Sequence, residues 1–322
     1  MAQPNIFRSI AKRVVRKLTV LKDGGVARIS PRRPIIVLMR YSILQRKVGG
    51  EGWEMRRNTA FNDYRASLFD PDRLAQRLVS LRRIVLPSLK AQTAPLDPRY
   101  FRLIVFTSSE LPASHLAALK RTLAPLPWAM LEFVPADQKP DYDRAILAVL
   151  ASNRTAPGPI ATVRLDDDDA VCRTYLQRLS RYVTKANVGK VITFSYGFVG
   201  RFDHGRRRFT RFFRILTPFH AQGLARISHY DGSALAEGNV FAVDSSHLHL
   251  YRQPHIEDMS FPAFIRSFYD SQDTSGKVTH VVPQPGNRTT REFVSMHVGL
   301  AEDKPRGGDR EGSKAAAEAA EA

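Results

Sequence analysis

Four consecutive aspartates, Asp166 to Asp169, are the residues of this sequence best suited to chemistry. They follow an apolar run, 160–165, that predicts a buried strand. The carboxyl ends of strands border the ligand crevice in open α/β sheets, and carboxylates there suit Mg²⁺ or Mn²⁺ that also contacts substrate phosphates. The alternative is a solvated acidic loop or a helix N-terminus, where aspartate is favoured. Residue spacing alone allows either of two metal-binding pairs, Asp166 with Asp168 or Asp167 with Asp169.

Arg40 and Tyr41 end the first apolar run, 35–39, and are the next candidates. An arginine at a strand end can bind a nucleotide or its phosphates, and a tyrosine beside it can stack on a base. We expect Asp166 and Asp167 to contact the same ligand. The alternative for Arg40 is an ordinary surface cation.

Short apolar runs alternate with segments of helical period from Pro34 onward. This alternation is typical of a mostly parallel sheet flanked by helices. The predicted strands are 35–39, 101–106, 128–134 and 160–165. The predicted helices are 72–89, 114–123, 142–152 and 175–183. The sequence therefore predicts a mixed α/β fold that brings the aspartates and Arg40 to one edge of a sheet.

The pattern is less regular after Gly189. We expect strands over 191–198 and 209–215, joined by a turn at 203–205, then a strand over 239–243 and a short helix over 261–269. The segment 206–214 interleaves arginine with phenylalanine, as nucleic-acid binders do, although a hairpin with a cationic outer face has the same composition. His247 and His249 lack the further ligands that a zinc site needs.

The chain has 322 residues and a formal net charge of +18, which predicts attraction to phosphates. Residues 1–33 carry nine lysines and arginines against one aspartate. They predict a basic amphipathic extension, which either lies on anionic lipid or is solvated. A domain over 34–300 and a flexible tail over 301–322 complete the expected organisation.

The single cysteine, Cys172, excludes an internal disulfide framework, as in a reducing cytoplasm. No apolar stretch is long enough to span a membrane or resembles a secretory signal. We therefore expect a cytoplasmic protein with peripheral contact on the inner membrane through its basic extension. A protein that only binds nucleic acid or an anionic membrane surface is the alternative, but it leaves the four aspartates unexplained.

The order of strands and helices before the aspartates resembles that of GT-A glycosyltransferases, whose sheet is Rossmann-like. More narrowly, residues 34–300 resemble the bacterial putative rhamnosyl transferase family. The Arg164–Ala170 segment, Arg-Leu-Asp-Asp-Asp-Asp-Ala, is the specific part of this resemblance. The supporting segments are Leu38–Ser42, Leu68–Leu74, Leu86–Thr93, Phe106–Ser109 and Leu111–Pro112.

This resemblance implies transfer of a sugar from a nucleoside-diphosphate donor, a dTDP- or UDP-sugar, to a carbohydrate or lipid-linked acceptor. It also implies a divalent ion, Mn²⁺ or Mg²⁺, and inversion at the anomeric carbon. Rhamnose as the sugar rests on the family description alone, and nucleic acid is not an expected partner.

The same resemblance assigns roles to individual residues. It implies Asp166 and Asp168 as the metal-binding pair with Asp169 beside them, and His297 as a late metal ligand. Asp258 is the first candidate for the catalytic base, with Glu257 second. From the residues alone, Asp258 and Glu257 could equally begin a helix, and His297 could be an ordinary edge or core residue.

Overall fold

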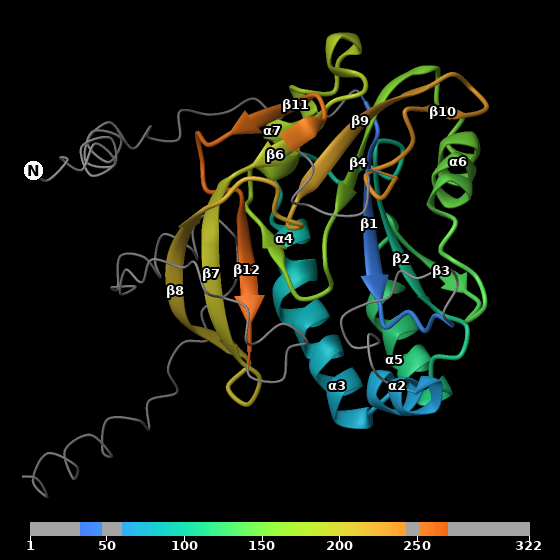
Figure 1. The fold of residues 1–322 in the computed structure, drawn as a ribbon, viewed down its shortest axis with the longest axis vertical. Coiled ribbons are helices and arrows are strands. Elements are labelled where there is room, and N and C mark those ends of the chain that lie inside the picture. The colour runs from blue at the N-terminus through green and yellow to red at the C-terminus, as the bar shows by residue number, and fades with distance from the viewer. Residues whose placement is uncertain (1–32, 47–59, 243–250, 270–322) are drawn as a thin grey trace, which may run out of the picture.

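The computed structural model describes residues 33–46, 60–242 and 251–269. Two β-sheets and the helices around them make up this part of the chain (Figure 1). The expected mixed sheet, mostly parallel and flanked by helices, is confirmed. The described residues do not include the expected C-terminal tail. Of the expected N-terminal extension they include only the last residue.

The larger sheet has eight strands in the order β11-β6-β9-β4-β1-β2-β3, with β10 paired to β9. Only β9 runs against the others, so all the remaining strands end at the same edge. Its strands are β1 (Ile35–Tyr41), β2 (Phe101–Ser108), β3 (Ala129–Val134), β4 (Gly158–Arg164), β6 (Val191–Phe194), β9 (Leu224–Tyr230), β10 (Leu235–Ala236) and β11 (His255–Asp258).

Helices cover both faces of the larger sheet. Because strand side chains alternate between faces, Val37 of β1 packs in the core that contains Leu74, whereas Leu38 packs with Ile146. Helices α3, α4, α5 and α7 contribute to the first core, and α6 to the second. The helices are α2 (Phe61–Leu68), α3 (Pro71–Ser80), α4 (Leu86–Lys90), α5 (Ala113–Leu123), α6 (Tyr142–Ser152) and α7 (Tyr175–Ser180), with a 3₁₀ turn at Lys185–Asn187.

Helix α3 begins at a well-formed cap. The Asp70 side chain accepts a hydrogen bond from the Arg73 backbone amide at 2.8 Å, and Pro71 occupies the first turn. A π-helical turn, Leu81–Val85, joins α3 to α4, so the helix predicted over 72–89 is confirmed as one continuous helical segment.

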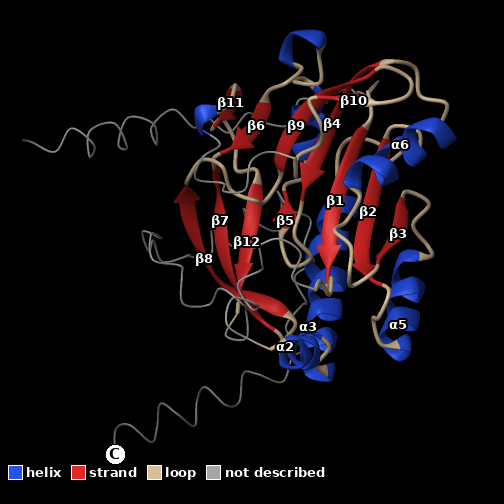
Figure 2. Ribbon diagram, turned by 45° about the vertical axis from the view of Figure 1, so that its right-hand side comes forward, coloured by secondary structure: helices blue, strands red, loops and turns tan. Residues whose placement is uncertain are grey.

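The smaller sheet has the order β5-β12-β7-β8 and lies beside the larger one (Figure 2). Its strands are β5 (Ala170–Val171), β12 (Phe264–Phe268), β7 (Tyr196–Asp203) and β8 (Arg208–Leu216). Strands β7 and β8 form an antiparallel hairpin, which confirms the turn expected at 203–205. Strand β5 follows the aspartates directly, so the Asp166–Asp169 segment connects the two sheets.

Two predictions about secondary structure are corrected. The helix expected over 261–269 is strand β12, and the strand expected over 239–243 is a turn at residues 240–242. Strand β9 and helix α2 were not anticipated. Within the described ranges, no helix combines the length and the apolar content needed to cross a bilayer.

Candidate functional site

Strands β1 and β4 flank a reversal in strand order. From β1 the chain moves to β2 and β3 on one side, whereas β4 pairs with the opposite side of β1. In open α/β sheets, ligands bind outside the carboxyl ends of strands at such a switch point. Arg40 lies near the end of β1, and Arg164 and the aspartates lie at the end of β4. The topology therefore locates the candidate site here.

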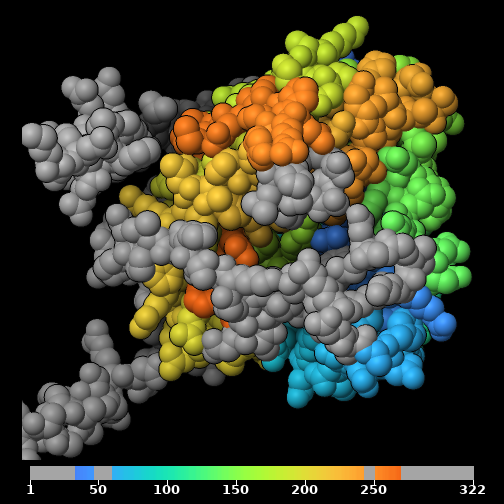
Figure 3. Space-filling view, viewed as in Figure 1, coloured from blue at the N-terminus to red at the C-terminus, as the bar shows by residue number. Residues whose placement is uncertain are grey.

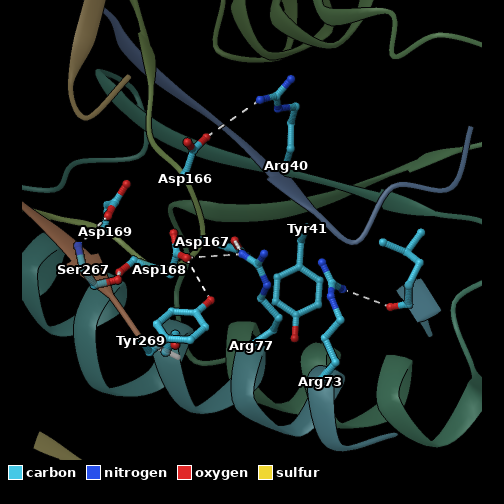
Figure 4. A network of polar contacts seen from close by, with 12 residues as sticks. Arg40, Tyr41, Arg73, Arg77, Asp166, Asp167, Asp168, Asp169, Ser267 and Tyr269 are labelled. Atoms are coloured by element: carbon cyan, nitrogen blue, oxygen red, sulfur yellow. Dashed lines mark hydrogen bonds and ion pairs between the residues drawn. The ribbon is translucent and has the colours of Figure 1, made fainter. Parts of the chain in front are cut away.

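Asp166 faces two arginines at this point (Figure 4). Its Oδ2 lies 3.2 Å from Nη2 of Arg164, and its Oδ1 lies 4.0 Å from Nη2 of Arg40. The Asp166 side chain is 29% exposed, so its carboxylate remains accessible. Two guanidinium groups against one carboxylate leave a net positive charge that favours an anionic ligand.

Aromatic rings support the two arginines. The guanidinium carbon of Arg40 lies 4.9 Å from the centre of the Phe241 ring, and that of Arg164 lies 5.6 Å from it. The Phe241 ring stacks on Tyr142, the first residue of α6, at 4.4 Å. Burial and the neighbouring Arg164 lower the pKa of Arg40 to about 10, so it stays cationic at neutral pH. An added anion would relieve the repulsion between the guanidiniums.

Asp167 and Asp168 face the other side of the sheet, toward Arg77 of α3 (Figure 4). Nη1 of Arg77 lies 2.5 Å from Oδ1 of Asp167 and 3.5 Å from Oδ2 of Asp168. The Tyr269 hydroxyl donates to Oδ2 of Asp168 at 2.9 Å. Burial raises the pKa of Asp167 to about 7, against the opposing effect of Arg77. Asp167 also has one buried oxygen, Oδ2, without a hydrogen-bond partner among the described residues.

Asp169 is held by the smaller sheet. Its Oδ1 accepts from the backbone amide of Ser267 in β12 at 2.9 Å, and its Oδ2 accepts from Gln222 at 2.7 Å. The Ser267 hydroxyl donates to the Asp168 carbonyl oxygen at 2.5 Å. Burial and the neighbouring Asp168 raise the pKa of Asp169 well above its ordinary value. These contacts anchor the end of the aspartate segment between the two sheets.

The family described as "Putative rhamnosyl transferase" matches residues 34–280, well over half of the chain. The chain belongs to this family. Membership supports a transferase of the glycosyltransferase kind. A search of curated proteins finds no match.

Solved structures give distant similarities. One is the mannosyltransferase PcManGT from Pyrobaculum calidifontis in complex with GDP-Man and Mn²⁺, with 17% identity, a TM-score of 0.28, and coverage of 58% of this chain and 41% of that chain. This chain therefore spans less than half of that protein. Another is a putative glucose-1-phosphate thymidylyltransferase from Bacillus anthracis in complex with sucrose, with 9% identity, a TM-score of 0.30, and coverage of 72% of this chain and 87% of that chain. The fold class rests on the strand order described above.

In this rhamnosyl transferase family member, the side chains of Arg40 and Tyr41 lie on opposite faces of β1, although the two residues are adjacent in sequence. Adjacent strand residues point to opposite faces, and the Tyr41 side chain is fully buried on the α3 face. Its hydroxyl lies 2.7 Å from Nε2 of His115 of α5, and the two rings stack at 5.8 Å. The stacking on a base that we expected for Tyr41 does not fit this position.

The predicted base candidates lie on β11, at the same sheet edge as the aspartates. Strands β9 and β6 separate β11 from β4, so β11 lies three strand spacings from β4, a total of about 14 Å. Although burial disfavours its charged form, hydrogen bonds from Ser260 and Tyr182 hold the pKa of Asp258 below its ordinary value. Glu257 accepts from the Ser195 hydroxyl. His297, His247 and His249 lie outside the described residues.

The aspartates differ in how well their carboxylates could bind a metal ion. Asp168 and Asp169 already accept hydrogen bonds from buried protein donors, whereas Asp166 keeps an accessible carboxylate. Among the described residues, no three histidine, cysteine, aspartate or glutamate side chains are placed to share a metal ion. Mg²⁺ does not need such a set, because it is often bound by one or two carboxylates together with substrate phosphates and water. Asp166 fits that kind of site.

Sequence reasoning missed several partners of these groups. Arg77 lies on α3, remote in sequence from the aspartates, and Tyr269 was expected in a helix. Phe241 was expected in a strand, but it lies in a turn where its ring contacts Arg40. The spacing of these residues in the sequence carries no signal, because only the tertiary fold brings them together. Arg164 could have been found, since it lies near a predicted strand end, two residues before Asp166.

Proposed function

We propose that this protein is a GT-A-like, inverting glycosyltransferase that moves a sugar from a nucleoside-diphosphate donor to an acceptor hydroxyl. The observation that carries the proposal is the convergence of Arg40, Arg164 and the accessible Asp166 at the switch point between β1 and β4. In this proposal the two guanidiniums bind the diphosphate. The sugar is rhamnose, as the family description suggests, carried by dTDP or UDP, and the acceptor is a carbohydrate or a lipid-linked sugar.

The leaving group sets the main electrostatic demand. Breaking the bond to the anomeric carbon places growing negative charge on the diphosphate, and fixed cations lower the energy of that state. Arg40 and Arg164 are already oriented by Asp166 and the Phe241 ring, so little reorganisation is needed. A divalent ion held by Asp166 would supply further positive charge to the same phosphates. Asp168, Asp169 and His297 were expected as further ligands, but the described contacts of Asp168 and Asp169 favour a positioning role.

Inversion requires a base on the acceptor side, and we assign this role to Asp258, with Glu257 as the second candidate. Asp258 is ionised at neutral pH, as a general base must be, and the hydrogen bonds that lower its pKa hold the charged carboxylate in place. Its position at the same sheet edge allows an acceptor to lie across the ends of β9 and β6, between the base and the donor. The Tyr182 hydroxyl, 2.9 Å from Oδ2, orients this carboxylate.

Thermal-shift titration with dTDP, UDP, GDP and CDP, with and without Mn²⁺, tests the donor site. We expect dTDP or UDP to stabilise the wild type most when Mn²⁺ is present, because a ligand bound only to the native state raises its stability. Asp166→Asn and Arg164→Gln should each weaken this binding about tenfold or more, since each removes a charged contact. The exposed Asp63→Asn is the matched control and should bind like the wild type.

The same titration separates Asp166 from Asp168. Asp168→Asn should lower the melting temperature without ligand, because it weakens buried contacts with Arg77 and Tyr269. Asp166→Asn should lower that temperature less than Asp168→Asn, because the Asp166 side chain is 29% exposed. If no nucleotide stabilises the wild type, or if Asp166→Asn keeps full Mn²⁺-dependent binding, the proposed donor site is wrong.

A further inference from the structure

The hairpin of β7 and β8 is strongly cationic. Residues 201–214 contain six arginines and one carboxylate, Asp203. All six arginines are exposed, and residues of the hairpin reach the surface in Figure 3. The six are Arg201, Arg206, Arg207, Arg208, Arg211 and Arg214, which we call the arginine hairpin.

The strand register brings like charges together in the arginine hairpin. Arg201 of β7 lies directly opposite Arg211 of β8. Two positive charges that face each other across neighbouring strands repel, and a bound anion reduces this repulsion. Asp203 interacts with Arg206 at the turn, with 3.8 Å between the charged atoms. Within the described part of the chain, the side chains of Arg207, Arg208 and Arg211 make no hydrogen bond or ion pair.

Most aromatic residues of this segment point inward, whereas Phe213 lies on the same face of β8 as Arg211. Gly200 leaves room for the rings of Phe209 and Phe212, which would lie 2.7 Å and 2.9 Å from a β-carbon at that position. Phe202 and Phe212 are buried, and Phe209 and Phe213 are half-buried. Single-stranded nucleic acids are bound by exposed rings on which bases stack. The nucleic-acid interpretation of this segment therefore keeps a single half-buried ring, Phe213, beside the array of guanidinium groups.

We propose that the arginine hairpin is a docking surface for the anionic headgroups of a lipid bilayer. A bilayer presents a plane of phosphates, and the guanidinium groups on one face of the hairpin and at its turn can meet such a plane without a pocket or a ring. Arg201, Arg208 and Arg211 share this face, whereas Arg214 pairs with Phe198 and lies on the opposite face. The turn lies at one end of the smaller sheet beside α3, where His204 lies 3.1 Å from the Ser80 hydroxyl, and away from the helices α5 and α6 (Figure 1). Charge complementarity fits the anionic headgroups, and the shortage of exposed rings favours this occupant over the stacked bases of a single-stranded nucleic acid.

The arginine hairpin is connected to the aspartate segment through side chains. His204 in the turn lies edge-on to Tyr269, with ring centres 4.5 Å apart, and Tyr269 donates to Asp168. Docking would therefore hold the candidate site at a fixed distance from the membrane. The surface contains none of the residues that we assign to the donor, so its test is independent of the proposed function.

Vesicle co-sedimentation of the full chain tests this surface. The variant Arg207→Asn/Arg208→Gln/Arg211→Gln removes three exposed charges, and asparagine suits residue 207 because its φ is +52°. The control Lys120→Gln/Arg121→Gln/Lys139→Gln removes three exposed charges beside α5 and β3, so the two variants have equal net charge. Vesicles of phosphatidylcholine with and without phosphatidylglycerol supply the surface.

We expect the hairpin variant to partition onto the anionic vesicles about 100-fold more weakly than the wild type, and the control within about threefold of it. None of the proteins should bind vesicles of phosphatidylcholine alone. Equal partitioning of the two variants would show that the arginine hairpin is not the docking surface and would overturn the proposal. So would a hairpin variant that keeps vesicle binding but loses binding to a single-stranded oligonucleotide. If the triple variant does not fold, Arg208→Gln against Lys120→Gln gives the same comparison with a smaller expected loss.

Discussion

Replacing Arg77 with methionine removes one charge and leaves two buried carboxylates without their nearest cation. The Arg77 side chain is 14% exposed, and those of Asp167 and Asp168 are 5% and 6% exposed. Methionine keeps much of the apolar stem, so the change acts mainly on charge. Breaking a buried ion pair by removing one partner costs about 3–5 kcal/mol, because the remaining charge is uncompensated. We expect a loss of stability in this range for Arg77→Met at neutral pH and above.

The loss should depend on pH. Burial raises the folded-state pKa of Asp167 to about 7, above its unfolded value, and Arg77 opposes this rise. A raised pKa stabilises the protein below the unfolded pKa, and that contribution disappears as pH rises through the folded pKa. Without Arg77 the folded-state pKa of Asp167 rises further. At low pH Asp167 is then protonated and neutral, so the loss of its cation destabilises the protein less. The destabilisation of Arg77→Met is therefore smaller at about pH 5.5 than at about pH 8.

Thermal unfolding followed by circular dichroism at these two pH values measures the effect. We expect the melting temperature of Arg77→Met to fall by about 10 °C at the higher pH. The neighbouring Arg83 is exposed, so Arg83→Met is the matched control and should change stability by less than about 0.5 kcal/mol. A fall in melting temperature of the same size at both pH values would refute the argument about Asp167, and no fall at all would refute the buried ion pair.

Three further predictions concern the surroundings of the site. Tyr269→Phe should cost about 1–3 kcal/mol in urea unfolding, because buried Asp168 loses the hydroxyl that donates at 2.9 Å. Gly200→Ala should cost about 1–3 kcal/mol, since its β-carbon would lie 2.7 Å from the Phe209 ring, whereas Gly205→Ala should be nearly neutral. Burial raises the pKa of Cys172 to about 11, so a thiol reagent at neutral pH should modify it only after unfolding, and equal rates for native and unfolded protein would contradict this.

Apolar strands at the centre of the larger sheet were predictable from sequence. Strand β1 is buried on both faces, so its residues form a continuous apolar run that stands out. Strand β9 carries arginine, serine and histidine among its seven residues and gives no such signal. It becomes a strand because it pairs with both β4 and β6. Its formation depends on tertiary pairing that local composition does not encode.

Two other errors have local causes. Residues 264–268 have helix-like apolar spacing, but pairing with β7 and β5 makes them strand β12. Asn239 precedes four apolar residues, 240–243, that suggested a strand. Its side-chain oxygen accepts from the Phe241 backbone amide at 2.7 Å, which forms a turn instead. Side-chain bonds of this kind compete with strand pairing and are hard to weigh from sequence.

The place of the aspartate segment was predictable, but the different roles of its four members were not. The segment leaves β4 at the edge where Asp166 turns toward Arg40 and Asp167 turns toward Arg77, on opposite faces of the sheet. Asp168 and Asp169 then contact Tyr269 and Ser267 of the following sheet. Repulsion among adjacent carboxylates is reduced because each one meets a donor or a cation, with Arg77 shared by Asp167 and Asp168. The fold thus uses three aspartates to fix the junction of two sheets, and this leaves Asp166 as the carboxylate that can meet a ligand.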